Sequence, residues 1–204
     1  MARPSNTAQR REEIARAFAR VMAGKGYEGA SLADAAREAG LSPGLVHYHF
    51  HDKRDVLLAT VSLLSQDAER RLDAALERAG EAPEARIVAI VDAHLRIGED
   101  SDEAAVACWV AIAAEAVRDH RVRAAYREVT ELTLSRLEKL FGKALAARHG
   151  DARGAKAAAA AVHAAIQGYF VLATTVPDAI PRGSSAQAVR TLALALVARS
   201  ADDC

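Results

Sequence analysis

Apolar residues recur along most of the chain at spacings of three and four, which is the period of an amphipathic α-helix. The first such segment runs from about Thr7 to Lys25, and its apolar face consists of Ile14, Ala17, Phe18, Val21 and Met22. No stretch alternates apolar and polar residues in the way that a half-buried strand does. The pattern therefore predicts an all-α protein.

Later segments with the same period are separated by glycine, proline or short polar corners, so the expected loops are short, as in helical bundles. A long helix is expected first, from Asp52 or Lys53 to about Arg78. Five more follow, at about Pro83 to Ile97, Asp102 to Val117, Arg121 to Ala147, Ala152 to Thr175 and Ser185 to Ser200. With the pair described next, the pattern predicts about nine helices.

Two short helices joined by a tight turn are predicted between Ser31 and Lys53. Ser31 suits an N-cap, and Gly40 suits the left-handed position at which the first helix ends. Ser42 caps the second helix, and Pro43 stands at its first position, where no backbone N–H is needed. This order is typical of a helix-turn-helix, whose second helix lies in the major groove of DNA. An ordinary helical hairpin inside a bundle has the same spacing.

The segment LVHYHFHDK at residues 45–53, followed by DVLL at 55–58, gives a more specific signal. Together with the preceding helix pair and the break at Gly26-Tyr27, it resembles the N-terminal region of the TetR family of bacterial repressors. The resemblance covers the chain to about Thr60. Around Trp109 to Leu137 there is a weaker likeness to the betaine-synthesis repressor subgroup of that family.

The resemblance implies a three-helix DNA-binding head at residues 1–52 and a larger helical bundle for ligand binding and dimerisation at residues 53–204. It further implies a transcriptional repressor that binds a palindromic operator in double-stranded DNA as a homodimer and is released by a small-molecule effector. An activator, or a regulator that senses a protein partner instead of a metabolite, stays open as an alternative.

The same resemblance, carried over position by position, implies which residues contact DNA. Base edges and phosphates would be met by Ser31, Arg37, Ser42, Pro43, Gly44, Leu45, His47, Tyr48 and Lys53. Gly44 and Leu45 offer no side-chain hydrogen bond, so direct base reading falls to Ser42, His47 and Arg37. His49 is expected to pack between the helices of the head.

A small-molecule pocket in the larger domain is also implied, although ordinary core packing explains each candidate residue equally well. The candidates are His94, Trp109, Glu115, Tyr126, Gln167, Tyr169 and Phe170. The likeness to the betaine-synthesis repressors hints at a small cationic or osmolyte-related effector.

The last two predicted helices indicate how the chain assembles. Residues 155–165 are almost all small, and residues 186–198 are apolar on most sides, so both helices need partners over most of their surface. We therefore expect a two-fold homodimer in which these two helices of each subunit form the interface. Burial wholly within one subunit is the alternative.

The net charge is zero, with 27 basic and 27 acidic residues, but the charges are unevenly distributed. The first 25 residues contain two acidic side chains, Glu12 and Glu13, and a larger set of basic ones, namely Arg3, Arg10, Arg11, Arg16, Arg20 and Lys25. Acidic residues dominate at 99–103 and at 202–203. The N-terminal face can therefore still hold DNA.

Other function classes find little support. The chain has no glycine-rich phosphate loop and no nucleophile elbow, so we expect no enzyme and no cofactor. His47 and His51 have the helical spacing of metal ligands, yet nothing nearby completes a site, and no metal is expected. Cys108 and Cys204 are too few for a disulfide framework. The N-terminus lacks the apolar core of a signal peptide, and no apolar run approaches the length of a membrane span, so a cytoplasmic protein without a membrane partner is expected.

Overall fold

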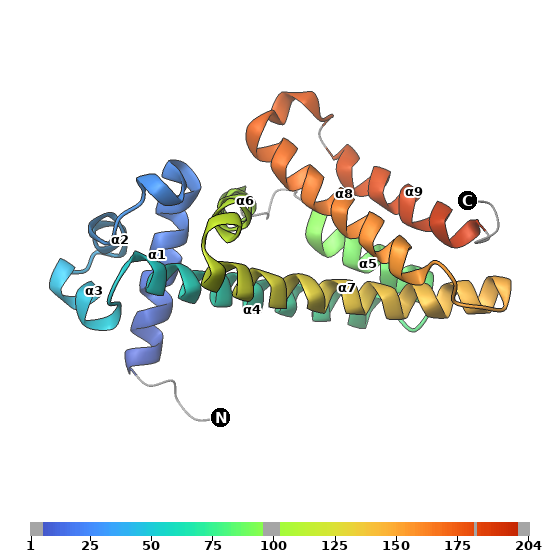
Figure 1. Ribbon diagram of the computed structural model, residues 1–204, viewed down its shortest axis with the longest axis horizontal. Helices are drawn as coiled ribbons and strands as arrows, with labels where there is room; N and C mark the ends of the chain where they lie inside the picture. The colour runs from blue at the N-terminus through green and yellow to red at the C-terminus, as the bar shows by residue number, and fades with distance from the viewer. Residues whose placement is uncertain (1–5, 96–102, 182, 200–204) are drawn as a thin grey trace. The chain divides into compact units, whose positions relative to one another are not determined.

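The computed structural model describes residues 6–95, 103–181 and 183–199. Over these ranges the chain forms nine α-helices and one short 3-10 turn, and none of the described residues lies in a strand (Figure 1). The prediction of an all-α protein is confirmed.

The helices occur in the predicted order, and most of their ends lie within a few residues of the expected ones. Their bounds are α1 (Asn6–Gly29), α2 (Leu32–Ala39), α3 (Pro43–His49), α4 (Lys53–Ala79), α5 (Pro83–Leu95), α6 (Glu103–Arg118), α7 (His120–His149), α8 (Ala155–Thr175), the 3-10 turn Pro177–Ala179 and α9 (Ser184–Ala198). Arg3, the acidic run at 99–102, Ser200 and Cys204 lie outside the described residues.

The chain divides into two compact units. The first comprises Met1–Asp67 and Asp102–Glu128, and the second comprises Ala68–Ser101 and Val129–Cys204. Helices α1, α2, α3 and α6 belong to the first unit, and α5, α8 and α9 belong to the second. The first unit therefore groups α6 with the three N-terminal helices.

The core of the first unit lies along the predicted apolar face of α1, which packs against α2, α3 and α6. Ile14, Phe18 and Met22 are essentially inaccessible, and so are Val46 and Phe50 at the other side of that core. Each such side chain contributes roughly 1.5–3 kcal/mol by leaving water. This packing fixes where α3 lies relative to α1.

Gly26 breaks α1 at the predicted position. Its φ of 68° and ψ of 172° are not helical, and only glycine adopts this conformation without strain. The chain turns there so that the Tyr27 ring meets the Phe18 ring edge-on, with centroids 6.5 Å apart. Gly26 therefore separates the last turn of α1 from the rest of the helix.

In the second unit, α5 packs against both α8 and α9, and α8 packs against α9 (Figure 1). His149 Nε2 lies 2.9 Å from the Val197 carbonyl oxygen, and Arg190 forms an ion pair with Asp92. Helix α8 begins at Ala155, three residues later than predicted, because Gly154 takes a left-handed φ of 83°. The first of these contacts joins α9 to the end of α7, and the second joins α9 to α5.

Helix α8 is long and apolar enough, by length and composition alone, to cross a membrane: it has 21 residues and a mean hydropathy of 1.4. The expectation that no apolar run approaches that length is therefore wrong. In the structure 33% of this stretch is buried, and Val162, Ile166 and Phe170 face the interior of the second unit. Most of the other apolar residues of α8 are exposed or half-buried.

Candidate nucleic-acid interface

The first helix of the predicted pair is capped as its sequence indicates. Ser31 is extended, with φ −132° and ψ 162°, and its side chain accepts a hydrogen bond from the Asp34 backbone N–H at 3.0 Å. The Ser31 hydroxyl in turn donates to the Asp34 carboxylate at 2.7 Å. Both functions of this hydroxyl are thus used within the protein.

Asp34 ties the end of α1 to α2. Its carboxylate accepts from Lys25 Nζ at 2.8 Å and also pairs with Arg37. The hydrogen bond from Lys25, followed by the one from Ser31, lowers the pKa of Asp34 to about 2. Two predicted DNA contacts, Ser31 and Arg37, therefore meet at one carboxylate, while the Arg37 side chain stays 75% exposed.

The turn between α2 and α3 has the predicted caps. Gly40 is left-handed, with φ 66° and ψ 29°, and the next residue's N–H, that of Leu41, donates to the Ala36 carbonyl at 2.9 Å. Ser42 is the N-cap of α3, where its side chain accepts from the Leu45 N–H at 3.3 Å, and Pro43 follows in the first turn. The capping predictions for both helices are confirmed.

One face of α3 is open to solvent and the opposite face is buried. Tyr48 is 79% exposed, Leu45 is half-buried, and Val46 and His49 are buried. The other exposed members of the face are Ser42, Pro43, Gly44 and His47. His49 is buried, as a side chain packed between helices would be, and its ring meets the Tyr48 ring edge-on with centroids 5.1 Å apart. The residues of this segment that are predicted to contact base edges thus share the accessible face of α3, and the opposite face of this helix is buried in the protein.

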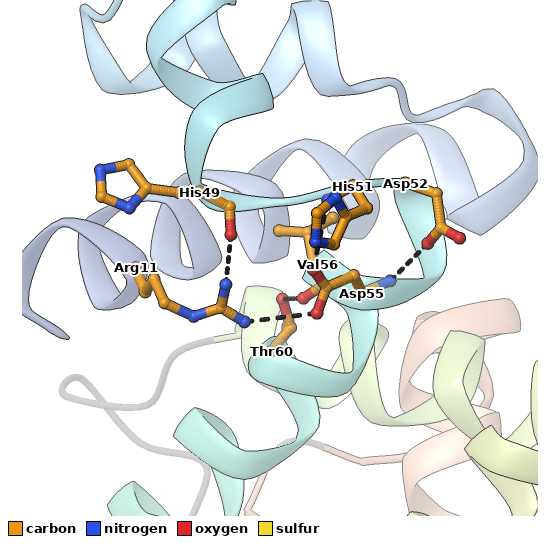
Figure 2. Close-up of polar contacts among 7 residues, drawn as sticks. All are labelled: Arg11, His49, His51, Asp52, Asp55, Val56 and Thr60. Carbon is orange, nitrogen blue, oxygen red and sulfur yellow. Dashed lines mark hydrogen bonds and ion pairs between the residues drawn. The ribbon is translucent and has the colours of Figure 1, made fainter. Parts of the chain in front are cut away.

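Arg11 fastens this arrangement, as Figure 2 shows. Its guanidinium donates to the backbone carbonyl of His49 at the end of α3 and pairs with Asp55 of α4 at 3.3 Å. It also lies over the Phe50 ring, 4.1 Å from the centroid. One side chain of α1 therefore fixes the end of α3 and the beginning of α4, and the sequence pattern identifies Arg11 only as one of several N-terminal basic residues.

The start of α4 is built from the same group of polar contacts. Asp52 accepts from the Asp55 N–H at 2.7 Å, and Asp55 accepts from the His51 N–H at 3.2 Å (Figure 2). One turn further on, the buried Thr60 hydroxyl donates to the Val56 carbonyl at 2.8 Å. Asp52 thus caps α4 at the position where the sequence predicts its beginning.

Lys53, a predicted phosphate contact, already has partners. Its ammonium donates to the Glu28 carbonyl at 3.1 Å and lies 4.3 Å from the centre of the Tyr27 ring. Burial, with a further contribution from the Glu115 carboxylate, raises the pKa of Tyr27 to about 12, so this phenol stays neutral. Lys53 is therefore held near the break in α1.

The other described basic residues near the N-terminus are also ion-paired. Arg20 lies 2.6 Å from Glu38, and Arg16 lies 2.9 Å from Glu12 and 3.1 Å from Asp67. Two further pairs are Arg10 with Glu13 at 2.6 Å and Arg54 with Asp119 at 2.5 Å. The basic surplus of this region is thus largely neutralised within the protein.

Three candidate ligand residues, Trp109, Glu115 and Tyr126, belong to the first unit. The Trp109 and Tyr126 rings lie 6.3 Å apart at an angle of 52°, and both are half-buried. Glu115 interacts electrostatically with Tyr27. The structure thus brings Trp109 and Tyr126 together.

The other four candidates belong to the second unit. Phe170 is buried, whereas Gln167 and Tyr169 of the same helix are half-buried. His94 Nδ1 lies 2.8 Å from the Ile90 carbonyl oxygen, and burial lowers its pKa. His94 therefore stays neutral at pH 7.

The structure offers no candidate metal site among the residues that it describes. Among them, no three histidine, cysteine or carboxylate side chains lie close enough together to hold a metal ion. His47 and His51 are both exposed, and α3 ends at His49, so His51 does not lie on the same helix as His47 and the expected helical spacing of the two does not occur.

Comparison with known proteins agrees with the fold. Residues 14–60 match the family model for bacterial regulatory proteins of the tetR family, and residues 83–198 match that for the C-terminal region of BetI-type transcriptional repressors. The chain is 31% identical over 150 residues to the HTH-type transcriptional regulator BetI of Brucella suis biovar 1 (strain 1330), covering 72% of this chain and 75% of that protein. The BetI of Agrobacterium fabrum is 35% identical over 114 residues, 56% of this chain and 54% of the relative.

Two solved structures share the fold. A transcriptional regulator from Rhodococcus sp. Rha1 has a TM-score of 0.80 at 23% identity, covering 92% of this chain and 96% of that one. A regulator from Saccharomonospora viridis in complex with choline has a TM-score of 0.77 at 23% identity, covering 95% and 97%. These relatives are regulators, in agreement with the expectation that the chain is not an enzyme. The chain belongs to the TetR family of bacterial transcriptional regulators, and its C-terminal region is of the BetI type.

Proposed function

We propose that this regulator is a cytoplasmic repressor that binds a palindromic operator as a homodimer and leaves it when a small organic effector binds to the protein. The observation that carries the DNA-binding part is the exposed face of α3, in which Ser42, His47 and Tyr48 are accessible while Val46 and His49 fix the helix from behind. A helix held in this way can enter the major groove without being remodelled.

Each exposed group on this face has a chemical role in the proposal. Ser42 and His47 donate to or accept from base edges, and the half-buried Leu45 meets a thymine methyl group. The small Gly44 lets the backbone approach the bases closely, and Pro43 sets the start of the helix. Tyr48 donates its hydroxyl to a phosphate. Ser31 and Lys53 exchange their present partners for phosphate oxygens, and Arg37 leaves Asp34 to meet a base edge.

The proposed dimer rests on an apolar stripe on the exposed side of α8. This stripe consists of Ala157, Ala161, Ala164, Gly168, Val171 and Leu172. On α9, Leu192 and Leu194 are 38% and 41% exposed. Small residues allow helices to approach closely, and a second copy of the same surface would cover the stripe. Two α3 helices are needed because one contacts too few bases for useful specificity.

The proposed effector response is a shift between conformations of the dimer. An effector that binds better to the form with low affinity for DNA reduces operator binding by its differential affinity alone. A coupling of roughly 1–3 kcal/mol corresponds to about 5–150-fold weaker DNA binding. The related structure in complex with choline supports a small organic molecule as the effector.

Fluorescence anisotropy tests the DNA-binding part of the proposal directly. The labelled duplex would carry the region upstream of the protein's own coding sequence, and excess unrelated duplex would be present across a salt series. We expect dimer-sized binding that survives the competitor and weakens as salt rises. His47→Ala combined with Ser42→Ala should remove the preference for this duplex and retain weak general binding. Equal affinity of wild type and double variant for every duplex would contradict the assignment of α3 as the reading helix.

A further inference from the structure

Two side chains of the second unit carry buried nitrogen atoms without a hydrogen-bond partner. Among the side chains that the structure describes, these atoms are Nη1 of Arg136 and both ring nitrogens of His163. His163 lies on α8 and is 9% exposed, and Arg136 lies on α7. Buried N–H groups in native proteins almost always have an acceptor, so these atoms point to a further binding partner.

His94 on α5 lies within electrostatic range of both side chains, Arg136 and His163. Its Nδ1 donates to the Ile90 carbonyl at 2.8 Å, and Nε2 is therefore the acceptor nitrogen of a neutral ring. Helices α5, α7 and α8 thus contribute one side chain each to a histidine–arginine cluster, defined as His94, Arg136 and His163.

Only one terminal nitrogen of the Arg136 guanidinium, Nη2, lies near a carboxylate among the described residues. Nη2 lies 2.6 Å from a Glu69 carboxylate oxygen and 3.9 Å from Asp73, whereas Nη1 has no acceptor. Arg71 adds a second positive charge within electrostatic range of His94. Burial, with a smaller effect of His94, lowers the pKa of His163 to about 4, so at pH 7 its ring is neutral and has one N–H to donate.

We propose that Arg136 and His163 of the histidine–arginine cluster bind the carboxylate of a small organic acid. A carboxylate has only acceptor oxygens, and it matches the free guanidinium N–H groups of Arg136 and the imidazole N–H of His163. Buried Ile90, Leu137 and Ile166 of the same three helices suit an apolar remainder of the ligand. That this acid is also the effector rests on the proposed function, whereas its binding does not.

Isothermal titration of the full-length protein with sodium hexanoate tests the proposal, with hexanamide and choline chloride as the uncharged and cationic comparisons. We expect hexanoate to bind about tenfold or more tightly than either comparison. His163→Leu and Arg136→Gln should each weaken hexanoate binding by about tenfold. His163→Gln keeps an N–H donor and should stay within about threefold of the wild type.

Glu69→Gln provides the matched control, because it breaks the same ion pair as Arg136→Gln but leaves the Arg136 guanidinium in place. We expect unchanged or tighter hexanoate binding for this variant. Equal weakening by Glu69→Gln and Arg136→Gln would show that Arg136 acts only through its ion pair, and would overturn the proposal. Absence of hexanoate binding to the wild type, or preference for choline, would also overturn it.

Operator binding is measured separately in the same samples. If hexanoate binds in the cluster-dependent way and leaves operator affinity unchanged, the carboxylate site stands and the effector role of this acid is contradicted. If choline releases the operator and hexanoate does not bind to the protein, the release mechanism stands and the carboxylate site is contradicted. The two proposals therefore fail on different readouts.

Discussion

At the scale of single residues, Arg11 differs from the other basic residues of α1 because it contacts both α3 and α4. It joins α3 and α4 through the His49 carbonyl and the Asp55 carboxylate, 38 and 44 positions away along the chain. We expect Arg11→Ala to lower the free energy of unfolding by about 1–2 kcal/mol, because charged hydrogen bonds to partly buried groups are lost. Urea denaturation measures this loss.

Arg10→Ala is the control for that measurement. Among the residues that the structure describes, Arg10 pairs with Glu13 on its own helix, and such an exposed pair contributes about 0.3–0.5 kcal/mol. Similar losses for the two variants would contradict the assigned role of Arg11.

Tyr48 is the residue for which stability and DNA affinity should separate most clearly. Its ring is 79% exposed, so Tyr48→Phe should leave the unfolding free energy within about 0.5 kcal/mol of the wild type. Loss of the proposed phosphate hydrogen bond should weaken operator binding by roughly three- to tenfold. Anisotropy at fixed salt checks this expectation, and unchanged affinity would remove Tyr48 from the interface.

Sequence reasoning succeeds for residues whose environment is local. The caps Ser31, Gly40 and Ser42 act within three or four positions, so their roles can be read from the chain. Arg11 and His163 acquire theirs from partners on other helices, and a lone histidine in an alanine-rich helix carries no local signal.

At the scale of whole helices, the exposed apolar stripe of α8 makes a prediction about assembly. Leu172→Asp should dissociate the proposed dimer, since a carboxylate buried in an apolar interface is strongly unfavourable. Leu132→Asp on α7 is the matched control, because both leucines are 42% exposed. Sedimentation of the three proteins at equal concentration tells them apart. A stable dimer of Leu172→Asp would contradict the interface.

The helix boundaries show which sequence signals suffice. The sequence predicts both ends of α4 correctly to within a residue or two. Asp52 caps the start of the helix, and Gly80, with a φ of 72°, follows its last residue. The sequence predicts α8 to begin too early, since the segment before Gly154 has good helix propensity and the left-handed glycine is decisive only in three dimensions. The sequence of α8 likewise does not show which of its apolar residues pack against α5 and α9, because that depends on the positions of those helices.

For the whole molecule, His163 links stability to pH. The ordinary pKa is 6.5 and the folded value is about 4, so the unfolded chain takes up a proton on this side chain at higher pH than the folded one. The unfolding free energy should therefore fall as the pH drops from 6.5 to about 4, by up to about 3 kcal/mol. His163→Leu should flatten this dependence in urea titrations across the range.

His120→Gln is the control for the pH series, because His120 is exposed. Asp34, whose pKa is about 2, acts in a separate window, losing its contribution only as the pH falls below 3.8. A pH dependence of His163→Leu equal to that of the wild type would assign the effect to other groups.

The ion pairs of the N-terminal region have a consequence for how this regulator finds its site. Arg16, Arg20 and Lys25 already hold protein carboxylates, which act as built-in counterions. A phosphate that takes over one of these cations leaves a carboxylate to recruit a salt cation, so little net ion release accompanies the exchange. General attraction to DNA is then weak for a protein with so many basic side chains near its reading helix. The regulator should spend little time sliding on unrelated sequences, and should reach its operator mainly through repeated encounters from solution.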